Sequence, residues 1–429
     1  MNIQTESSSR NYPSAPLYRL LCHGIVVIAT LNAVLRPSVD IPITPYYILM
    51  PLIFTVFITQ ITWARRWFLW FLVFACYGLL MGTLYGVPIL MQMAQLLKYA
   101  QLITFFALLT WLCRSDPFGQ FRLQKIVSLL TFLVFAIAGI QIITGFEFPT
   151  VANEESSLWL NTFFFTPNDL ALFLSGVLCL VLCSKADLLS KIIFFIAFFA
   201  LNVRNDAKAA VLASCLIIGM YALLRLCIKL RIRPIVAILA LTTIVVLILV
   251  TLGDTTIKIK ETEFNFIQLF LDPFERIINL EPYDLGGSIF DRTDALIYSI
   301  EALRSTWWLG LGPAGSIHTL SLPNTELLTA KSLHNAIAEV IVEFGPVALI
   351  IGYLLSQPLL RALFTPSPTN QQMAIIAFAV AAPLLSVSQS SGYISNYAFW
   401  LTAFLIWFAP SISRANMHVK PAAAVVPSK

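Results

Sequence analysis

The sequence predicts an all-α protein that crosses a membrane about twelve times. Of its 429 residues, 58% are hydrophobic and 11% are charged, whereas a soluble protein carries roughly a quarter charged residues. The mean hydropathy is +0.82, and the apolar residues come in runs of about 17–25, long enough for helices that span the hydrocarbon core. One polar insert, from Gly253 to Ser332, interrupts these runs.

The apolar runs divide the chain into four regions. An N-terminal bundle occupies 1–252, a large loop 253–335, a second group of spans 336–411 and a tail 412–429. The first sixteen residues are polar and lack a cleavage site after the first apolar run, so we expect a tail rather than a signal peptide. The predicted spans are 17–35, 45–64, 67–85, 89–113, 126–144, 168–184, 188–203, 209–227, 234–252, 336–357, 373–390 and 395–411.

The basic residues of the connecting segments predict the orientation in the membrane. Most lie on one side, while the short loops of the other side hold Arg36, Arg204 and Lys208. Because basic loops stay in the cytoplasm, we expect both termini there and the insert, between spans 9 and 10, outside. The net charge of +5 therefore reflects topology and does not point to a nucleic-acid partner.

The insert itself is predicted to form short amphipathic helices. Asp291 is a plausible N-cap for a helix that runs to Ser305, with Asp294 three residues on as an acidic capping partner. Trp307 and Trp308 then suit a membrane–water boundary. Apolar residues recur within this helix at helical spacing, at Leu296, Ile297, Ile300 and Leu303.

A histidine stands where the chain re-enters the membrane. Directly after His334, polar residues recur every four positions along the tenth span, at Asn335, Glu339 and Glu343. This spacing places them in one polar stripe on one face of the helix. Histidine accepts a proton near neutral pH, and carboxylates at such depth normally face partners or water inside a bundle. The alternatives are a polar histidine at the start of the helix that merely caps it or snorkels, and a Glu343 that only holds a neighbouring helix. Ser332 can also cap this helix.

Five cations of the outer side are candidates for binding phosphate: Arg204, Lys208, Arg292, Arg304 and Lys331. An arginine offers a planar fork of donors that matches phosphate oxygens and keeps its charge. The alternative for each is a contact with lipid headgroups. Lys98 lies inside the fourth span, where either an ion pair or a phosphate contact would offset its burial.

Several other classes of protein receive no support. The chain has no P-loop, GxSxG, HExxH or DxD motif, and the seven cysteines lie in or beside apolar runs, so we predict neither a metal nor a cofactor. The missing DxD motif is typical of enzymes that bind metal–nucleotide-sugar complexes. Because nucleotide sugars are not available outside the cytoplasm, an outward-facing enzyme that transfers sugars would need a lipid-linked donor. No internal repeat supports an inverted-repeat transporter, although an exporter or flippase stays open as an alternative.

Four stretches together resemble the O-antigen ligase and polymerase superfamily of bacterial envelope proteins. They are NTFFFTPNDLALFL (161–174), NDAKAAVLA (205–213), FDRTDALIYSIEALRSTWWLGLGPAGS (290–316) and SLHNAIAEVIVEFGPVALIIGY (332–353). The resemblance implies a GT-C-like fold. His334, Asn335 and Gly345 fit the spacing typical of the ligases, whereas Ala348 departs from their pattern. Arg292 matches the ligases' large-loop arginine, and either Arg204 or Lys208 matches their second cation.

The resemblance further implies a reaction in the inner membrane of a Gram-negative bacterium, at its periplasmic face. An O-antigen ligase transfers a glycan from undecaprenyl diphosphate to a sugar hydroxyl of the lipid A core. His334 would orient or deprotonate the acceptor, the cations would bind the diphosphate, and Glu339 would orient His334 or balance an arginine. The alternative within the superfamily is an O-antigen polymerase, whose arginine-to-glycine spacing is met by Arg304 and Gly315.

Overall fold

The computed structural model describes residues 16–37, 44–116, 118–146, 148, 160–205, 207–251, 256–259, 262–265, 275–282, 288–322, 333, 335–386 and 394–409. Before the insert, the helices are α1 (Pro16–Thr30), α2 (Pro45–Gln60), α3 (Thr62–Tyr85), α4 (Ile89–Ser115), α5 (Gly119–Thr144), α6 (Pro167–Cys183), α7 (Leu188–Arg204), α8 (Lys208–Leu230) and α9 (Pro234–Thr251). From the insert onward come β1 (Thr256–Ile259), β2 (Thr262–Asn265), α11 (Ser288–Ser305), α12 (Gly315–Thr319), α13 (Ala336–Phe344), α14 (Pro346–Phe364), α15 (Asn370–Ser386) and α16 (Tyr397–Trp407).

The described residues form a helical membrane protein. Within them, α3, α4, α5, α8 and α14 are long and apolar enough to cross a membrane, while α1, α2, α6, α9, α15 and α16 provide shorter apolar helices. Each predicted span overlaps at least one of the helices. The number of twelve crossings and the orientation stay predictions.

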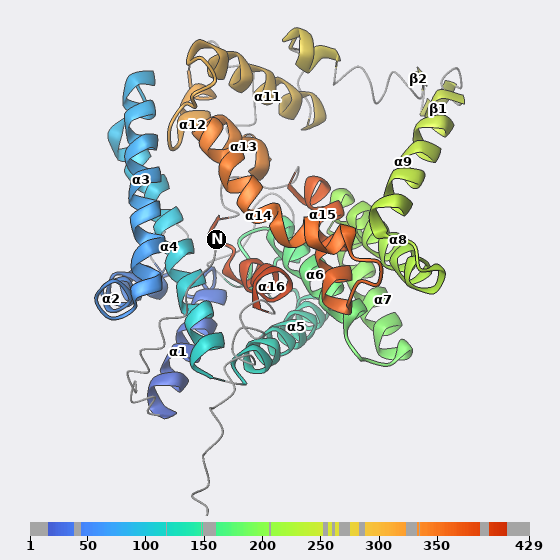
Figure 1. Ribbon diagram of the computed structural model, residues 1–429, viewed down its shortest axis with the longest axis horizontal. Coiled ribbons are helices and arrows are strands. Elements are labelled where there is room, and N and C mark those ends of the chain that lie inside the picture. The colour runs from blue at the N-terminus through green and yellow to red at the C-terminus, as the bar shows by residue number, and fades with distance from the viewer. Residues whose placement is uncertain are drawn as a thin grey trace, which may run out of the picture.

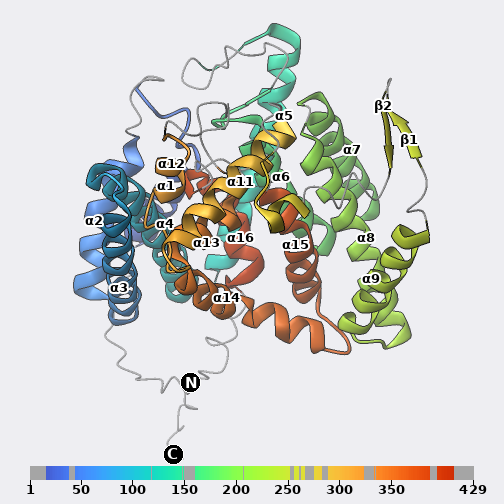
Figure 2. The ribbon, with the colours of Figure 1, turned by 90° about the horizontal axis from the view of Figure 1, so that it is seen from above.

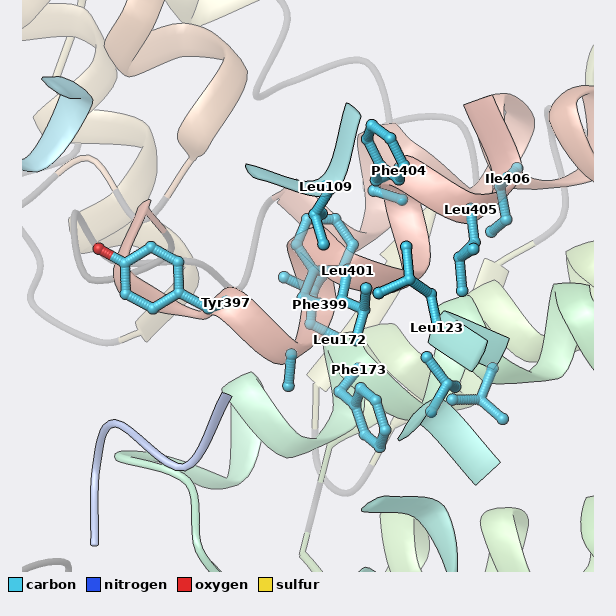
Figure 3. Close-up of a cluster of buried hydrophobic side chains, with 14 of the residues drawn as sticks. Leu109, Leu123, Leu172, Phe173, Tyr397, Phe399, Leu401, Phe404, Leu405 and Ile406 are labelled. Atoms are coloured by element: carbon cyan, nitrogen blue, oxygen red, sulfur yellow. The ribbon is translucent and has the colours of Figure 1, made fainter. Parts of the chain in front are cut away.

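The centre of the bundle is built around α6 and α16. Nearly every side chain of α16 is buried, as expected for a helix that is apolar on all sides and enclosed by others. Leu109 of α4, Leu123 of α5, Phe173 of α6 and Phe404 of α16 belong to this core (Figure 3). Gly176 lets α6 approach α16 closely, because a Cβ there would lie 2.2 Å from the Thr402 hydroxyl.

One end of the bundle carries α11, α12 and α13 (Figure 1); we call it the insert face. A small second core lies under it, formed by Ala295, Leu303, Leu311, Leu320, Leu333 and Val342. α8 and α9 pack against each other and form a helical hairpin, with the insert following α9. Lys208, which begins α8, therefore also lies toward the insert face. In the view from above, α11 and α13 lie over the middle of the bundle (Figure 2).

The insert contains a short antiparallel hairpin that the helical prediction for this segment misses. Thr256 of β1 pairs with Asn265 of β2, and Ile259 pairs with Thr262. The two segments read TIKI and TEFN. Polar residues alternate with isoleucine in the first segment, and β-branched or aromatic residues alternate with a charged or amide residue in the second, a period of two that favours strands.

The predicted helix of the insert begins earlier than expected. α11 starts at Ser288, so Asp291 lies inside the helix and the prediction of an N-cap there is wrong. Serine is itself a common residue at the start of a helix. The end of the helix, at Ser305, is confirmed.

The tenth predicted span is not one continuous helix. α13 ends at Phe344 and α14 begins at Pro346, with Gly345 between them at φ +50°. A Cβ on Gly345 would lie 2.5 Å from the carbonyl oxygen of Trp308, so the close approach of the insert requires glycine here. A glycine in this conformation followed by a proline interrupts a helix, which the prediction of one helix over 336–357 overlooked.

Candidate active site at the insert face

The turn between α7 and α8 presents two of the predicted cations. Arg204 ends α7, Lys208 begins α8, and both side chains are exposed. The Asn205 side chain ties this turn to the preceding loop: its amide donates to the Leu160 carbonyl at 3.0 Å and its oxygen accepts from the Leu160 N–H at 2.8 Å. The Ala207 N–H donates to the carbonyl of Asn202 at 2.9 Å. These hydrogen bonds fix the backbone of the turn that carries the two cations.

Arg292 occupies the early part of α11, where it is half-buried. Burial lowers the pKa of its guanidinium, although an arginine keeps its charge at any physiological pH. Arg304 is exposed in the last turn of the same helix. At ~1.5 Å of rise per residue their backbones are roughly 18 Å apart along α11. The helix therefore separates these two predicted phosphate ligands.

His334, Ser332 and Lys331 lie outside the described residues, but the residues on both sides of His334 are described. Leu333 is buried in the small core under the insert face, 2% exposed. Asn335 is the N-cap of α13, and its side-chain oxygen accepts from the Ala338 N–H at 3.1 Å. The helix cap predicted for Ser332 thus falls to Asn335. The chain is anchored immediately before and immediately after the histidine.

Glu339 is buried against α4. Its side chain is 0% exposed, and one oxygen accepts from the Gln95 side-chain amide at 3.3 Å. Lys98, half-buried one turn further along α4, interacts electrostatically with this carboxylate and with Glu343. The prediction that Glu339 faces a partner is therefore confirmed, and its cationic neighbour is Lys98.

Glu343, one turn further along α13, ties this helix to α12. It is 0% exposed and accepts from the Ser316 hydroxyl at 3.0 Å. This contact between α13 and α12 is the kind that the sequence alternative for Glu343, holding a neighbouring helix, predicts. One oxygen of each glutamate lacks a hydrogen bond within the described residues. Such groups are costly to bury. The contacts among α4, α12 and α13 are therefore expected to be sensitive to substitution.

We expect Glu343→Ala to destabilise the insert face. The substitution removes the acceptor for the buried Ser316 hydroxyl, and a buried polar group left without a partner costs about 1–3 kcal/mol. Glu343→Gln keeps one acceptor oxygen and should lose less. Thermal unfolding of the detergent-solubilised protein measures the difference. Glu301→Ala, at an exposed position of α11, is the control, and an equal loss there would refute the role of Glu343.

The loop between α11 and α12 packs directly on α3. Tyr77 of α3 donates its hydroxyl to the Leu309 carbonyl, and the Gly312 N–H donates to the Glu343 carbonyl at 2.9 Å. Gly312 has φ +79°, and a Cβ on it would lie 2.3 Å from the Cα of Gly82 in α3. Gly312 and Gly82 thus allow the backbone of the insert to contact the backbone of α3 directly.

Gly312→Ala is therefore expected to be strongly destabilising. A non-glycine residue at positive φ costs about 1–3 kcal/mol, and the new methyl would also displace α3. Gly352→Ala serves as the matched control, because a Cβ on this helical glycine of α14 meets nothing within 4 Å and alanine favours helix. The yield and melting temperature of the two purified variants check the prediction. Equal behaviour would mean that the loop does not rest on α3.

Packing between helices connects the elements that carry the candidate residues. α13 contacts α11, α12 and α15, and α15 in turn contacts α8 along its length. The helix of Arg292 is thus in direct contact with the helix that follows His334. The helix that begins at Lys208 joins them through α15. The structure brings Glu339, Glu343 and Lys98 together, whereas Arg304 lies at the far end of α11.

Gln95 and Ser316, the partners of the two glutamates, were not predicted from the sequence. A signal for the first was present: Gln92, Gln95, Lys98 and Gln101 recur every three residues in a mostly apolar helix, the spacing of one helix face. Gln92 is buried as well and packs against Gly82. Ser316 carried no comparable signal, because its contact depends on how the insert folds.

These features define a polytopic helical membrane protein in which the chain between α9 and α13 folds back over one end of the bundle. Residues 189–352 match the family model described as O-antigen ligase. This match confirms the resemblance noted in the sequence and is to a family of membrane enzymes of the ligase and polymerase type. The matched segment includes the α7–α8 turn, the insert and α13. No curated protein matches the chain.

Proposed function

We propose that this protein is an O-antigen ligase of a Gram-negative inner membrane. It transfers a glycan from undecaprenyl diphosphate to a sugar hydroxyl of the lipid A core oligosaccharide, at the periplasmic face. The observation that carries the proposal is the family match over 189–352, because this segment contains His334, Arg292, Arg204 and Lys208. The GT-C-like architecture, the four chain regions and the cytoplasmic termini are parts of the same proposal.

The proposed reaction is a direct displacement at the anomeric carbon. His334 accepts the proton of the acceptor hydroxyl as its oxygen forms the new glycosidic bond. The bond between the anomeric carbon and the diphosphate breaks, and undecaprenyl diphosphate leaves with the electron pair. Arg292, with Arg204 or Lys208, binds this leaving group and stabilises its growing charge. The attack inverts the anomeric configuration.

Glu339 and Glu343 act at a distance from the reacting atoms in this proposal. Their hydrogen bonds to Gln95 and Ser316 hold α13 against α4 and α12. Asn335 caps the same helix. Because His334 directly precedes this cap, we expect the position of α13 to fix where the histidine lies. These three residues are positioning residues, which suits their burial better than contact with substrate.

The proposed mechanism uses no metal ion and no cofactor. Transfer by the purified protein is therefore expected to continue at an unchanged rate after treatment with EDTA. Activity that disappears with EDTA and returns only with a divalent cation would contradict this part of the proposal.

An O-antigen polymerase is the second candidate, and the spacing from Arg304 to Gly315 favours it. Packing supplies another reason for this glycine: Gly315 begins α12, and a Cβ on it would lie 2.4 Å from the Leu311 Cβ. The spacing is thus explained without a polymerase motif. The ligase therefore stays the favoured function. A lipid-glycan flippase or exporter is the third candidate.

Deletion of the gene separates the three candidates. Loss of a ligase leaves bare lipid A core on the cell surface, while lipid-linked glycan accumulates on the periplasmic side of the membrane. Loss of a polymerase leaves single repeat units on the core. Loss of a flippase also leaves bare core, but the lipid-linked glycan then accumulates on the cytoplasmic side. Gel analysis of lipopolysaccharide, with impermeant labelling of the outer lipid-linked glycan, gives the answer.

A further inference from the structure

The loop between α11 and α12, residues 306–314, lies beside a part of α3 that is suited to cross the membrane. The Tyr77 hydroxyl donates to the Leu309 carbonyl. Trp63–Tyr85 is the segment of α3 that is long and apolar enough for a span. Tyr77 is roughly 12 Å from its Tyr85 end at ~1.5 Å per residue, a level that falls inside a hydrocarbon core ~30 Å thick. The Leu309 carbonyl therefore lies at membrane depth.

Two further contacts follow α3 from this level toward its Tyr85 end. A Cβ on Gly78 would lie 3.0 Å from the Pro313 Cδ, and a Cβ on Gly312 would lie 2.3 Å from the Gly82 Cα. The loop thus packs along the side of the apolar segment and not beyond its end.

The side chains that the loop exposes are large and apolar. Trp307, Trp308 and Leu309 are 86%, 53% and 43% exposed, whereas the residues from Gly310 to Ser316 are buried. The exposed residue Arg304, one turn earlier, is still charged. A run of exposed apolar side chains marks contact with a membrane or a partner, and the position beside α3 favours the membrane.

The backbone of the loop meets the requirement that a bilayer imposes. Irregular backbone at membrane depth is tolerated where protein groups satisfy its hydrogen bonds. The Trp308 N–H donates to the Leu303 carbonyl and the Leu311 N–H donates to the Val342 carbonyl, both at 3.0 Å. Backbone carbonyls likewise accept from the N–H groups of Thr306, Trp307, Leu309 and Gly312.

Both tryptophans have a strained backbone conformation. Trp307 has φ +57° and Trp308 has φ +62°, values that bulky residues rarely adopt because of steric repulsion. Such strain persists where the surroundings compensate for it. The transfer of two indole rings from water into lipid compensates, since the hydrophobic effect grows with the apolar area removed from water.

We propose that the loop between α11 and α12 dips into the bilayer, where Trp307, Trp308 and Leu309 contact the acyl chains of the leaflet nearest the insert face. The sequence predicts that 253–335 lies outside the membrane and that the two tryptophans lie at its boundary, so an embedded loop is a new feature. Because α11 leads directly into this loop, the loop fixes the height of α11 above the membrane. The inference does not depend on the proposed function.

Fluorescence quenching in nanodiscs measures the depth of the two tryptophans. The emission lost in the Trp307→Phe/Trp308→Phe variant, relative to the unsubstituted protein, belongs to these two residues. Phosphatidylcholine brominated in the middle of its acyl chains should remove most of this emission, while a quencher on the lipid headgroup or iodide in the water should remove little. Trp70→Phe gives the reference for a lipid-facing residue, because Trp70 is 74% exposed within the span of α3.

The other outcomes of this experiment overturn the proposal. Stronger quenching from the headgroup than from the acyl chains would place the tryptophans at the membrane boundary. Quenching by iodide would place them in water. Emission that no quencher reaches would mean that a protein surface covers them.

A charge at the tip of the loop tests the same inference through stability. Leu309→Asp should lower the melting temperature of the protein in nanodiscs by several degrees, because a carboxylate at membrane depth is costly. Ile278→Asp, at a 79% exposed position earlier in the insert, is the matched control and should change little. Equal changes in the two variants would mean that Leu309 faces water. Neither experiment requires glycosyl transfer, so both outcomes are independent of the ligase assignment.

Discussion

The His334→Ala protein is expected to fold, reach the membrane and lose glycan transfer. In the proposed reaction the imidazole takes the proton of the acceptor hydroxyl, and general base catalysis of this kind contributes roughly 10²–10⁴-fold to a rate. Folding should survive, because the neighbouring anchors do not involve the imidazole: Leu333 is buried under the insert face and Asn335 caps α13. Transfer by the purified variant, together with its melting temperature, measures both halves of this expectation.

A second histidine of the insert provides the control for this experiment. His318 of α12 is half-buried, and its ring lies 6.3 Å from that of Tyr85 in an edge-to-face contact. His318→Ala should retain transfer and lose at most some stability. A His334→Ala protein that ligates at the normal rate would remove this histidine from the mechanism, whatever the stability of the two variants.

The Arg292→Lys protein is expected to bind the donor diphosphate about 10–100-fold more weakly. Lysine preserves the charge but loses the planar fork that contacts two phosphate oxygens at once, and a hydrogen bond to a charged group contributes about 1.5–3 kcal/mol. Arg292 is half-buried, so the new ammonium group cannot compensate freely through water. Titration of undecaprenyl diphosphate against the purified variant measures the dissociation constant.

Arg276→Lys is the matched control for Arg292→Lys. Arg276 also lies in the insert and is half-buried, but the proposed mechanism gives it no part. Equal losses for the two variants would indicate a general effect of the insert's charge. Undiminished donor binding by Arg292→Lys would argue against a bidentate diphosphate contact.

The helices of this protein were predictable because each depends on a local pattern. A run of apolar residues satisfies its own backbone hydrogen bonds in a membrane only as a helix, so each predicted span overlaps a helix in the structure. The break at Gly345 could have been anticipated from the glycine–proline pair. Its close contact with the insert could not, because the Trp308 carbonyl that leaves no room for a Cβ at Gly345 belongs to a distant segment.

The candidate site was predictable in its residue types and not in its contacts. The stripe of Glu339 and Glu343 followed from four-residue spacing, and both side chains are fully buried. Their partners Gln95 and Ser316 lie in other elements, so only the tertiary fold identifies them. Gly312 against Gly82 is the same case, since a close approach of two backbones leaves no periodic trace in either segment.

The central claim is tested most directly by purified protein that receives one lipid-linked glycan and two acceptors in parallel. One acceptor is lipid A core, and the other is a second lipid-linked repeat unit. The account predicts a new glycosidic bond on lipid A core, release of undecaprenyl diphosphate and no elongation of the second lipid-linked unit. Elongation of the lipid-linked unit with the core left bare, or movement of the glycan without any new bond, would contradict it.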